Sequence, residues 1–290
     1  MRIWQSIAFA ETEQLVDIAV AAEELGYTGL TTADHLVTPQ AIEAPYPYSE
    51  DGSIWWDPNT DFPDVWMAAA VLAQHTTSLR FMPLVYIPPL REVFSVAKLI
   101  STAAVFSNNR VELGAGVGWM KDEFLLTGQD FHRRGRHTDE MLEVLRKFLT
   151  TEGMVTHSGE FYDFPPVQME PVPTGPVPVL IGGVSKPALR RAARWDGWLG
   201  INFEIDELEQ MVGQLNAARQ EAGTADRDDY RIMMALNQAP TLSDVERLTE
   251  MGVTDLNVVP WLFSHGLATT SIEFKRDTMA AIADSVISRL

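Results

Sequence analysis

One histidine stands at the end of an expected strand. Asp34-His35 follows directly after "TGLTT" (residues 28–32), a β-rich run typical of a short buried strand. An imidazole can donate or accept a proton near neutral pH, so His35 is a candidate catalytic acid or base. The alternative is a structural histidine tied to the following loop. The five other histidines are not placed so clearly at a strand end.

A second candidate site is the glycine pair in "LIGGVSK" (180–186). Gly182 and Gly183 end an expected strand, and Ser185 begins an amphipathic helix. Backbone amides at such a helix N-terminus, with a hydroxyl and a lysine nearby, favour a phosphate site. The alternative is that Ser185 only caps the helix, with a proline in its first turn.

Three further glycines follow another expected strand in "VELGAGVGW" (111–119). The dinucleotide fingerprint G-x-G-x-x-G is not met, because Trp119 and Met120 follow Gly118. Two interpretations stay open. Either the bare backbone lets a flat group lie close against it, or the glycines only allow the chain to bend.

Composition excludes several classes of site. The formal charge of −18 argues against nucleic acid and anionic membranes as partners. The chain has no cysteine, which excludes disulfides and thiolate ligands, and no H-E-x-x-H or similar motif favours a metal. The sequence shows no apolar run of about eighteen residues and no signal peptide, so we expect a cytoplasmic protein. Seven of the 22 basic residues fall within 133–136 and 186–194. Either they form solvated helix faces or they attract an anion.

The elements that must position these residues alternate regularly between helical and strand patterns. After an opening strand and the helix before "TGLTT", the expected helix–strand pairs are 62–77 with 79–87, 92–106 with 110–115, 135–150 with 177–182, 186–195 with 196–201, 205–222 with 230–237, and 243–251 with 254–259, before a last helix at 271–289. Eight of each in 290 residues predict a single-domain (β/α)8 TIM barrel over 1–290, rather than an open doubly wound sheet. Ser243 and Glu246 are expected to form a capping box.

Two insertions are too long for plain connections. Residues 34–61 follow the second strand and 151–176, with a hairpin-like "VTHSGEFYDF", precede the fifth. In a barrel the first of these lies on the active-site face, so we expect a functional loop there. Its aromatic residues are expected either to wall an apolar pocket or to pack the loop onto the barrel. They are Tyr46, Tyr48, Trp55 and Trp56.

Several motifs together resemble the bacterial-luciferase-like superfamily. They are "VAKLISTAAVFSNNRVELGAGVGWMKDEF" (96–124), "DHLVTP" (34–39), "FHRRGRHTDEMLEVLR" (131–146), "GEFYDF" (159–164) and "VLIGGVSKPALRRAARWDGWLG" (179–200). The loop "PYPYSEDG" (45–52), together with "GVGW" (116–119) and "FHRRGR" (131–136), makes the chain most similar to a branch of probable oxidoreductases that depend on the deazaflavin coenzyme F-420.

The resemblance implies a ring system at the C-terminal mouth of the barrel, with its phosphate arm at the turn after strand five. It also implies a non-prolyl cis peptide at Leu84-Val85 and a catalytic role for His35. The implied cofactor-binding residues are Leu84, Val85, Gly116, Val117, Gly118, Gly182, Gly183, Val184 and Ser185.

The sequence therefore predicts hydride transfer between coenzyme F-420 and a small, largely apolar substrate, with Trp55 and Trp56 at the substrate pocket. The first alternative is an FMN-dependent monooxygenase that uses reduced flavin and oxygen. The second is a non-catalytic protein that binds or carries a flavin. Relatives of this kind are often dimers, so we expect a homodimer.

Overall fold

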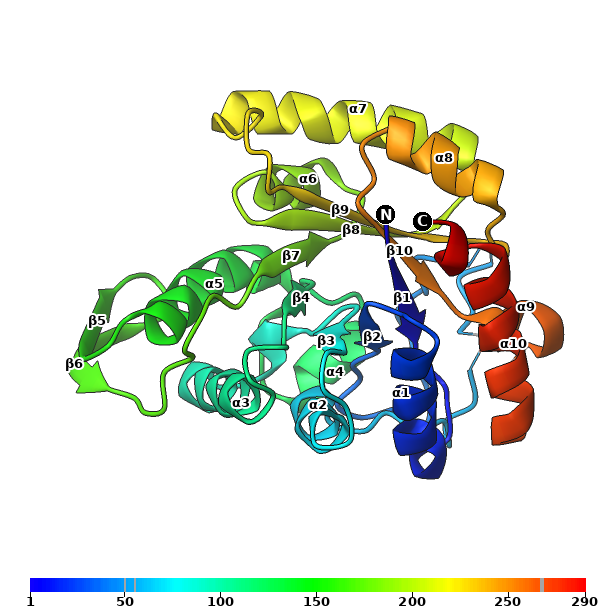
Figure 1. The fold of residues 1–290 in the computed structure, drawn as a ribbon. Coiled ribbons are helices and arrows are strands. Elements are labelled where there is room, and N and C mark those ends of the chain that lie inside the picture. Colours follow the sequence, from blue (N-terminus) through cyan, green and yellow to red (C-terminus); the bar gives the residue numbers. More distant parts are fainter. Residues whose placement is uncertain (50, 55, 267–268) are drawn as a thin grey trace.

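The computed structural model describes residues 1–49, 51–54, 56–266 and 269–290 of the chain. Eight parallel strands form one sheet in the order β3-β2-β1-β10-β9-β8-β7-β4 (Figure 1). They are β1 (Arg2–Ser6), β2 (Gly29–Thr32), β3 (Arg80–Pro83), β4 (Leu113–Ala115), β7 (Val179–Gly182), β8 (Gly197–Phe203), β9 (Arg231–Leu236) and β10 (Asp255–Val258). Parallel bridges Phe81–Val111 and Tyr86–Ala115 join the two outer strands. The sheet therefore closes into the predicted barrel.

Helices surround the barrel and bury one apolar face each against it (Figure 1). The helices that follow the predicted alternation are α1 (Leu15–Glu24), α2 (Val65–Ala73), α3 (Val93–Phe106), α5 (Arg134–Thr150), α6 (Lys186–Ala192), α7 (Ile205–Ala222), α8 (Leu242–Glu250) and α10 (Ile272–Ser285). Two short helices, α4 (Lys121–Leu126) and α9 (Pro260–His265), were not predicted, because six residues are too few to show a helical period. Short 3-10 turns cover Thr12–Gln14, Pro88–Leu90, Phe131–Arg133 and Ile287–Arg289.

The second insertion contains the predicted hairpin. Strands β5 (Met154–Ser158) and β6 (Asp163–Gln168) pair antiparallel and extend beside α5, outside the barrel (Figure 1). No helix among the described residues is both long and apolar enough to cross a lipid bilayer.

The predicted capping box at Ser243 and Glu246 is wrong. Helix α8 begins at Leu242, so Ser243 already lies inside its first turn. The box is formed two residues earlier: Thr241 Oγ1 accepts from Asp244 N at 3.2 Å, and Asp244 Oδ2 accepts from Thr241 N at 2.8 Å.

Side chains that point inward from the strands fill the middle of the barrel. This layer consists of Trp4, Met82, Leu180, Leu199 and Met233, each at most 2% exposed. Alternate residues along a strand face opposite sides, so the intervening residues pack against the helices instead. The barrel is a packed core rather than a channel.

Charged residues close the N-terminal end of the barrel. Arg231 donates to both oxygens of Asp255, at 2.7 and 3.2 Å, and also pairs with Glu112. Arg2 donates to the same Asp255 at 2.8 Å, and Arg80 donates to Glu112 at 2.5 Å. Burial raises the pKa of Asp255, but the hydrogen bonds and charge of Arg231 outweigh burial and leave the pKa below its ordinary value.

Candidate functional site

Asp34 fixes the backbone at the C-terminal ends of β2 and β3. Its carboxylate accepts the Ile87 amide at 2.9 Å and binds both terminal nitrogens of Arg91, at 2.7 and 2.9 Å. Burial raises the pKa of Asp34, and the Arg91 guanidinium opposes that rise. A bidentate pair of this kind sets geometry as well as charge. Asp34, which directly precedes His35, therefore anchors the loop after β3 to the segment after β2.

His35 makes a hydrogen bond that the sequence did not reveal. Its Nδ1 lies 3.1 Å from Oε2 of Glu123, in the first turn of α4. The side chain of His35 is 12% exposed and that of Glu123 is 3% exposed. The other oxygen of Glu123, Oε1, accepts the backbone amides of Leu36 and Val37, at 2.7 and 3.4 Å. One buried carboxylate thus holds both the imidazole and the loop that follows it.

The loop 34–61 packs as an aromatic cluster over this pair. The cluster contains Tyr46, Trp56 and Met120 as buried members, with Phe9, Ile42, Tyr48, Ile54, Phe62 and Trp119 packed against them. The ring of His35 lies 5.2 Å from Trp56, 5.0 Å from Phe62 and 6.0 Å from Trp119, between ring centroids. Trp56 is buried by packing, and its contact with a substrate remains a prediction. Trp55 lies outside the described residues.

The Leu84–Val85 peptide bond is cis, as the resemblance implied. Val85 lies between two of the predicted site glycines. A Cβ at Gly116 would come within 2.5 Å of Val85 Cγ2, and one at Gly182 within 2.7 Å of Val85 Cγ1. The ends of β4 and β7 therefore need glycine to accommodate Val85, and contact of these residues with a cofactor ring remains a prediction.

Gly118 turns the chain away from β4 with a φ of +83°. A Cβ there would come within 2.7 Å of Phe124 and 2.9 Å of Ile87, so the turn is packed against protein on its side-chain face. Arg134 Nε donates to the Gly118 carbonyl at 3.0 Å and fixes the turn from α5. Val117, between the two glycines, is partly exposed.

The turn after β7 combines a fixed backbone with free donors. Gly183 has a φ of +115°, and Trp198 Nε1 donates to its carbonyl at 2.9 Å. Ser185 caps α6 by accepting the Ala188 amide at 3.3 Å, as the alternative interpretation proposed. Across the described chain, the amides of Val184 and Ser185 donate to no protein acceptor. They remain available to an external anion.

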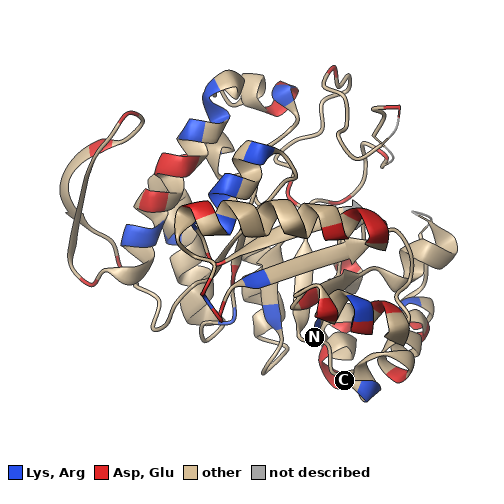
Figure 2. Cartoon of the chain, turned by 90° about the horizontal axis from the view of Figure 1, so that it is seen from above, with Lys and Arg blue, Asp and Glu red and all other residues tan. Residues whose placement is uncertain are grey.

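Most of the two basic stretches are already paired. The ion pairs are Arg133 and Arg136 with Glu160, and Arg191 and Arg194 with Asp139. Figure 2 shows how basic and acidic residues are distributed over the chain, with both signs present on several of its helices. Within the described ranges, three members have no ion pair: Arg134, which donates to the carbonyls of Gly118 and Phe131, Lys186, which directly follows the turn after β7, and Arg190, which lies in the last turn of α6. Of these three, the exposed Lys186 is the one that adjoins the turn after β7.

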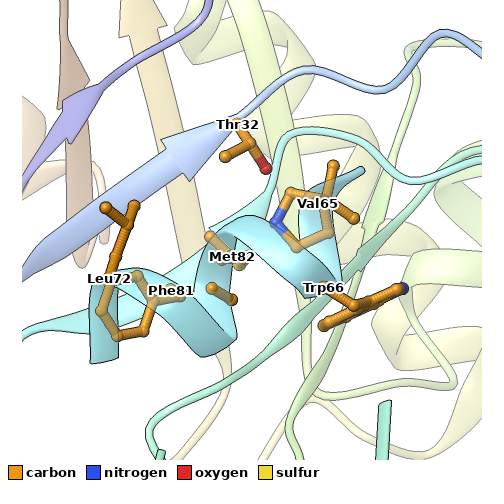
Figure 3. A pocket seen from close by; sticks show the side chains of 8 residues that line it. Thr32, Val65, Trp66, Leu72, Phe81 and Met82 are labelled. Atoms are coloured by element: carbon orange, nitrogen blue, oxygen red, sulfur yellow. The ribbon is translucent and has the colours of Figure 1, made fainter. Parts of the chain in front are cut away.

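The described chain has two further hollows. Figure 3 shows the first, a void of about 10 Å³ between α2 and strands β2 and β3 that has room for about one water molecule. The second is a polar surface hollow of about 300 Å³ between α5 and the β5–β6 hairpin. It is lined by Arg136, Asp139, Glu140, Glu143, His157, Ser158 and Gly159. Where the chain is described, no cluster of three or more His, Asp and Glu suits a metal ion.

The sequence predicted His35 but not its partner. Glu123 is 88 positions away, and its only signal was its place in the glycine-strand motif. Arg91 and Trp198, which hold the Asp34 carboxylate and the Gly183 carbonyl, carried no signal of their own.

Comparisons with known proteins agree with this architecture. A sequence model of the family described as luciferase-like monooxygenase matches residues 5–256. An uncharacterized protein of Mycobacterium tuberculosis is 34% identical over 293 residues, which cover 100% of both chains. An F-420-dependent glucose-6-phosphate dehydrogenase of Amycolatopsis mediterranei is 26% identical over 208 residues, 68% of this chain and 57% of that protein.

A solved structure supports the fold independently. An F-420-dependent secondary alcohol dehydrogenase in complex with an F-420–acetone adduct superposes with a TM-score of 0.77. The match covers 99% of this chain and 98% of the other at 15% identity. At that identity the likeness establishes the (β/α)8 fold.

Proposed function

The chain belongs to the luciferase-like monooxygenase family, and from that membership we propose that it uses coenzyme F-420 to exchange a hydride with a small, largely apolar organic substrate. As a member of this family it is an oxidoreductase, and proteins of this family use a deazaflavin or a flavin. The choice of F-420, the substrate class and the site residues are the parts that we propose.

The turn after β7 fits the anionic arm of such a cofactor. Val184 and Ser185 offer two amides without an acceptor in the described chain, and the exposed Lys186 next to them adds positive charge. Gly183 accommodates the tight turn that aims these donors. In this proposal the turn holds the phosphate, and the ends of β3 and β4 lie beside the ring.

The bound deazaflavin supplies or accepts a hydride at its ring. For a ketone or a secondary alcohol, a carbon that gains or loses a hydride requires its attached oxygen to gain or lose a proton. A side chain of the protein must therefore donate or accept that proton. His35 Nε2 is the group that we assign to this transfer. The aromatic cluster shields the imidazole, whose side chain is 12% exposed, which favours proton transfer between His35 and the substrate over transfer to bulk solvent.

The observation that carries the proposal is the His35–Glu123 pair at the end of β2. A histidine whose Nδ1 is held by a buried carboxylate has its other nitrogen available for acid–base chemistry. A histidine bound through both nitrogens would favour a purely structural role.

Titration of the purified protein with F-420 and with FMN tests the cofactor. We expect micromolar binding of F-420, followed by cofactor turnover with a panel of ketones, enones or secondary alcohols. Binding of FMN alone, with oxygen consumed by the reduced complex, would instead identify the flavin monooxygenase that the family name favours. Binding without any turnover would identify a carrier.

We also propose that the protein is a homodimer. Adjacent helices α2 and α3 expose large apolar side chains, including Met67 and Phe106 at 60% and 61% exposure. Large apolar side chains exposed on neighbouring helices favour association. Light scattering that gives the mass of a single 32.3 kDa chain at micromolar concentration rejects this part alone.

A further inference from the structure

The two oxygens of Glu123 do different work. Oε1 accepts two backbone amides, from Leu36 at 2.7 Å and from Val37 at 3.4 Å. Oε2 faces Nδ1 of His35 at 3.1 Å. Because both sites are buried in a side chain that is only 3% exposed, water does not replace either partner.

This arrangement determines which nitrogen of His35 carries the proton. An ionised carboxylate can only accept hydrogen bonds, and Oε1 already accepts from amides that cannot reverse. Nδ1 must therefore donate to Oε2, and in the neutral imidazole Nε2 is then the nitrogen without a proton. We propose that Glu123 is a positioning residue that holds His35 in the Nδ1–H tautomer, with Nε2 ready to accept a proton. The inference rests on the proposed function, in which His35 exchanges that proton with a substrate.

The aromatic cluster supports the same orientation. Trp56, Phe62 and Trp119 surround the imidazole with ring centroids 5.0 to 6.0 Å away. A half-turn of the ring would have to displace these neighbours, which are packed in one cluster. The ring therefore stays in the orientation in which Nδ1 meets Glu123.

The substitution Glu123→Gln should reverse the tautomer. The two amides of the loop require an acceptor, so the carbonyl oxygen of the glutamine must take the place of Oε1. Its NH2 group then faces Nδ1 and donates to it, which moves the imidazole proton to Nε2. The matched control is Asp122→Asn, which removes the same charge at the adjacent position, where Asp122 accepts the Ala44 amide at 3.4 Å and does not contact His35.

The tautomer can be read directly by NMR of the histidine ring nitrogens in the ¹⁵N-labelled full chain, with His35 assigned from its missing signals in His35→Gln. We expect Nδ1–H in the wild type and in Asp122→Asn, and Nε2–H in Glu123→Gln. If His35 of the wild-type protein carries its proton on Nε2, the inference is wrong, whether or not the variant folds. An unchanged tautomer in a folded Glu123→Gln variant also overturns it.

Turnover separates this inference from the proposed function. We expect kcat to fall about tenfold to a thousandfold in Glu123→Gln with little change in F-420 affinity, and no further fall when the same change is made in His35→Gln. Equal losses in both backgrounds mean that Glu123 does not act through His35, and the inference fails. Absence of F-420 binding and turnover in the wild type rejects the proposed function, whereas the tautomer result stands independently of it.

Discussion

The two ends of the barrel treat their polar groups in opposite ways. At the N-terminal end, Asp255 and Glu112 are at most 1% exposed, and each is bound by two arginines. At the C-terminal mouth, His35 is held through one nitrogen only, and the turn after β7 has amides without a protein acceptor in the described chain.

The difference between the two ends indicates where the fold can accommodate a ligand. A buried charge that lacks a partner costs several kcal/mol, so the closed end must satisfy its groups internally. The mouth is partly exposed, which lowers the cost of leaving donors free. The comparison therefore assigns stability from buried ion pairs to the closed end and chemistry to the mouth, and four predictions test or sharpen that division.

The largest effect is expected at the closed end. Arg231→Met leaves Asp255 and Glu112 buried with fewer partners, and should lower the free energy of unfolding by about 3–5 kcal/mol in guanidinium titrations. The matched control is Arg2→Met. Arg2 touches the same Asp255, but its side chain is 42% exposed, so the loss should be about 1 kcal/mol or less. Equal losses of unfolding free energy in the two variants would mean that burial of the arginine does not decide how much its ion pairs stabilise the fold.

At the mouth the effect should fall on activity. His35→Gln keeps a group able to bond Glu123 but cannot exchange a proton, so we expect kcat to fall about a hundredfold to ten-thousandfold. The free energy of unfolding and the F-420 affinity should change little. If turnover is retained while stability falls, His35 is structural and the division between the two ends is wrong.

The glycine turn at the mouth should contribute to stability through packing. Gly118→Ala places a Cβ 2.7 Å from Phe124, whereas Gly128→Ala meets nothing within 4 Å. Both residues have positive φ, +83° and +71°, so both variants carry a similar backbone cost. We expect Gly118→Ala to cost about 1–3 kcal/mol more in thermal or chemical unfolding. A difference near zero would show that the turn is not packed against Phe124.

The smallest effect concerns acid stability at the closed end. Glu23 accepts the amides of Thr77, Ser78 and Leu79 just before β3. Burial raises the pKa of Glu23, but hydrogen bonds from Ser78 and its neighbours outweigh it and lower the pKa to about 2. Since the folded pKa is depressed, this stabilisation is complete above the unfolded pKa of about 4.3 and is lost as the pH falls toward 2.

Glu23→Gln should therefore cost about 1 kcal/mol at pH 7 and weaken the loss of stability between pH 4.5 and 2. Glu24→Gln is the control, because Glu24 has a side chain that is 59% exposed and pairs only with Arg276 among the described residues. Urea titrations across this pH range measure both variants. An unchanged pH slope in Glu23→Gln contradicts the assignment.

The order of the elements and the barrel fold could be predicted from the amino-acid sequence. Apolar periodicity is a local property, so it predicted the eight alternating helices and strands and the β5–β6 hairpin. It also placed His35 at a strand end, and the family motifs located the cis peptide at Leu84–Val85. Helices α4 and α9 were not predicted, because six residues are too few to show a helical period.

The contacts that hold the site together form between segments far apart in the sequence and could not be predicted from it. Glu123 meets His35 across 88 positions, and Arg231 meets Glu112 across 119, because closure of the barrel gathers segments that are distant in the sequence at the same end of the barrel. Apolar periodicity and short motifs report on neighbouring residues, so they do not predict contacts between residues this far apart. The glycines give the same lesson: the sequence left Gly116 open between a bend and a wall, and the folded chain requires glycine there because the side chain of Val85 occupies the space.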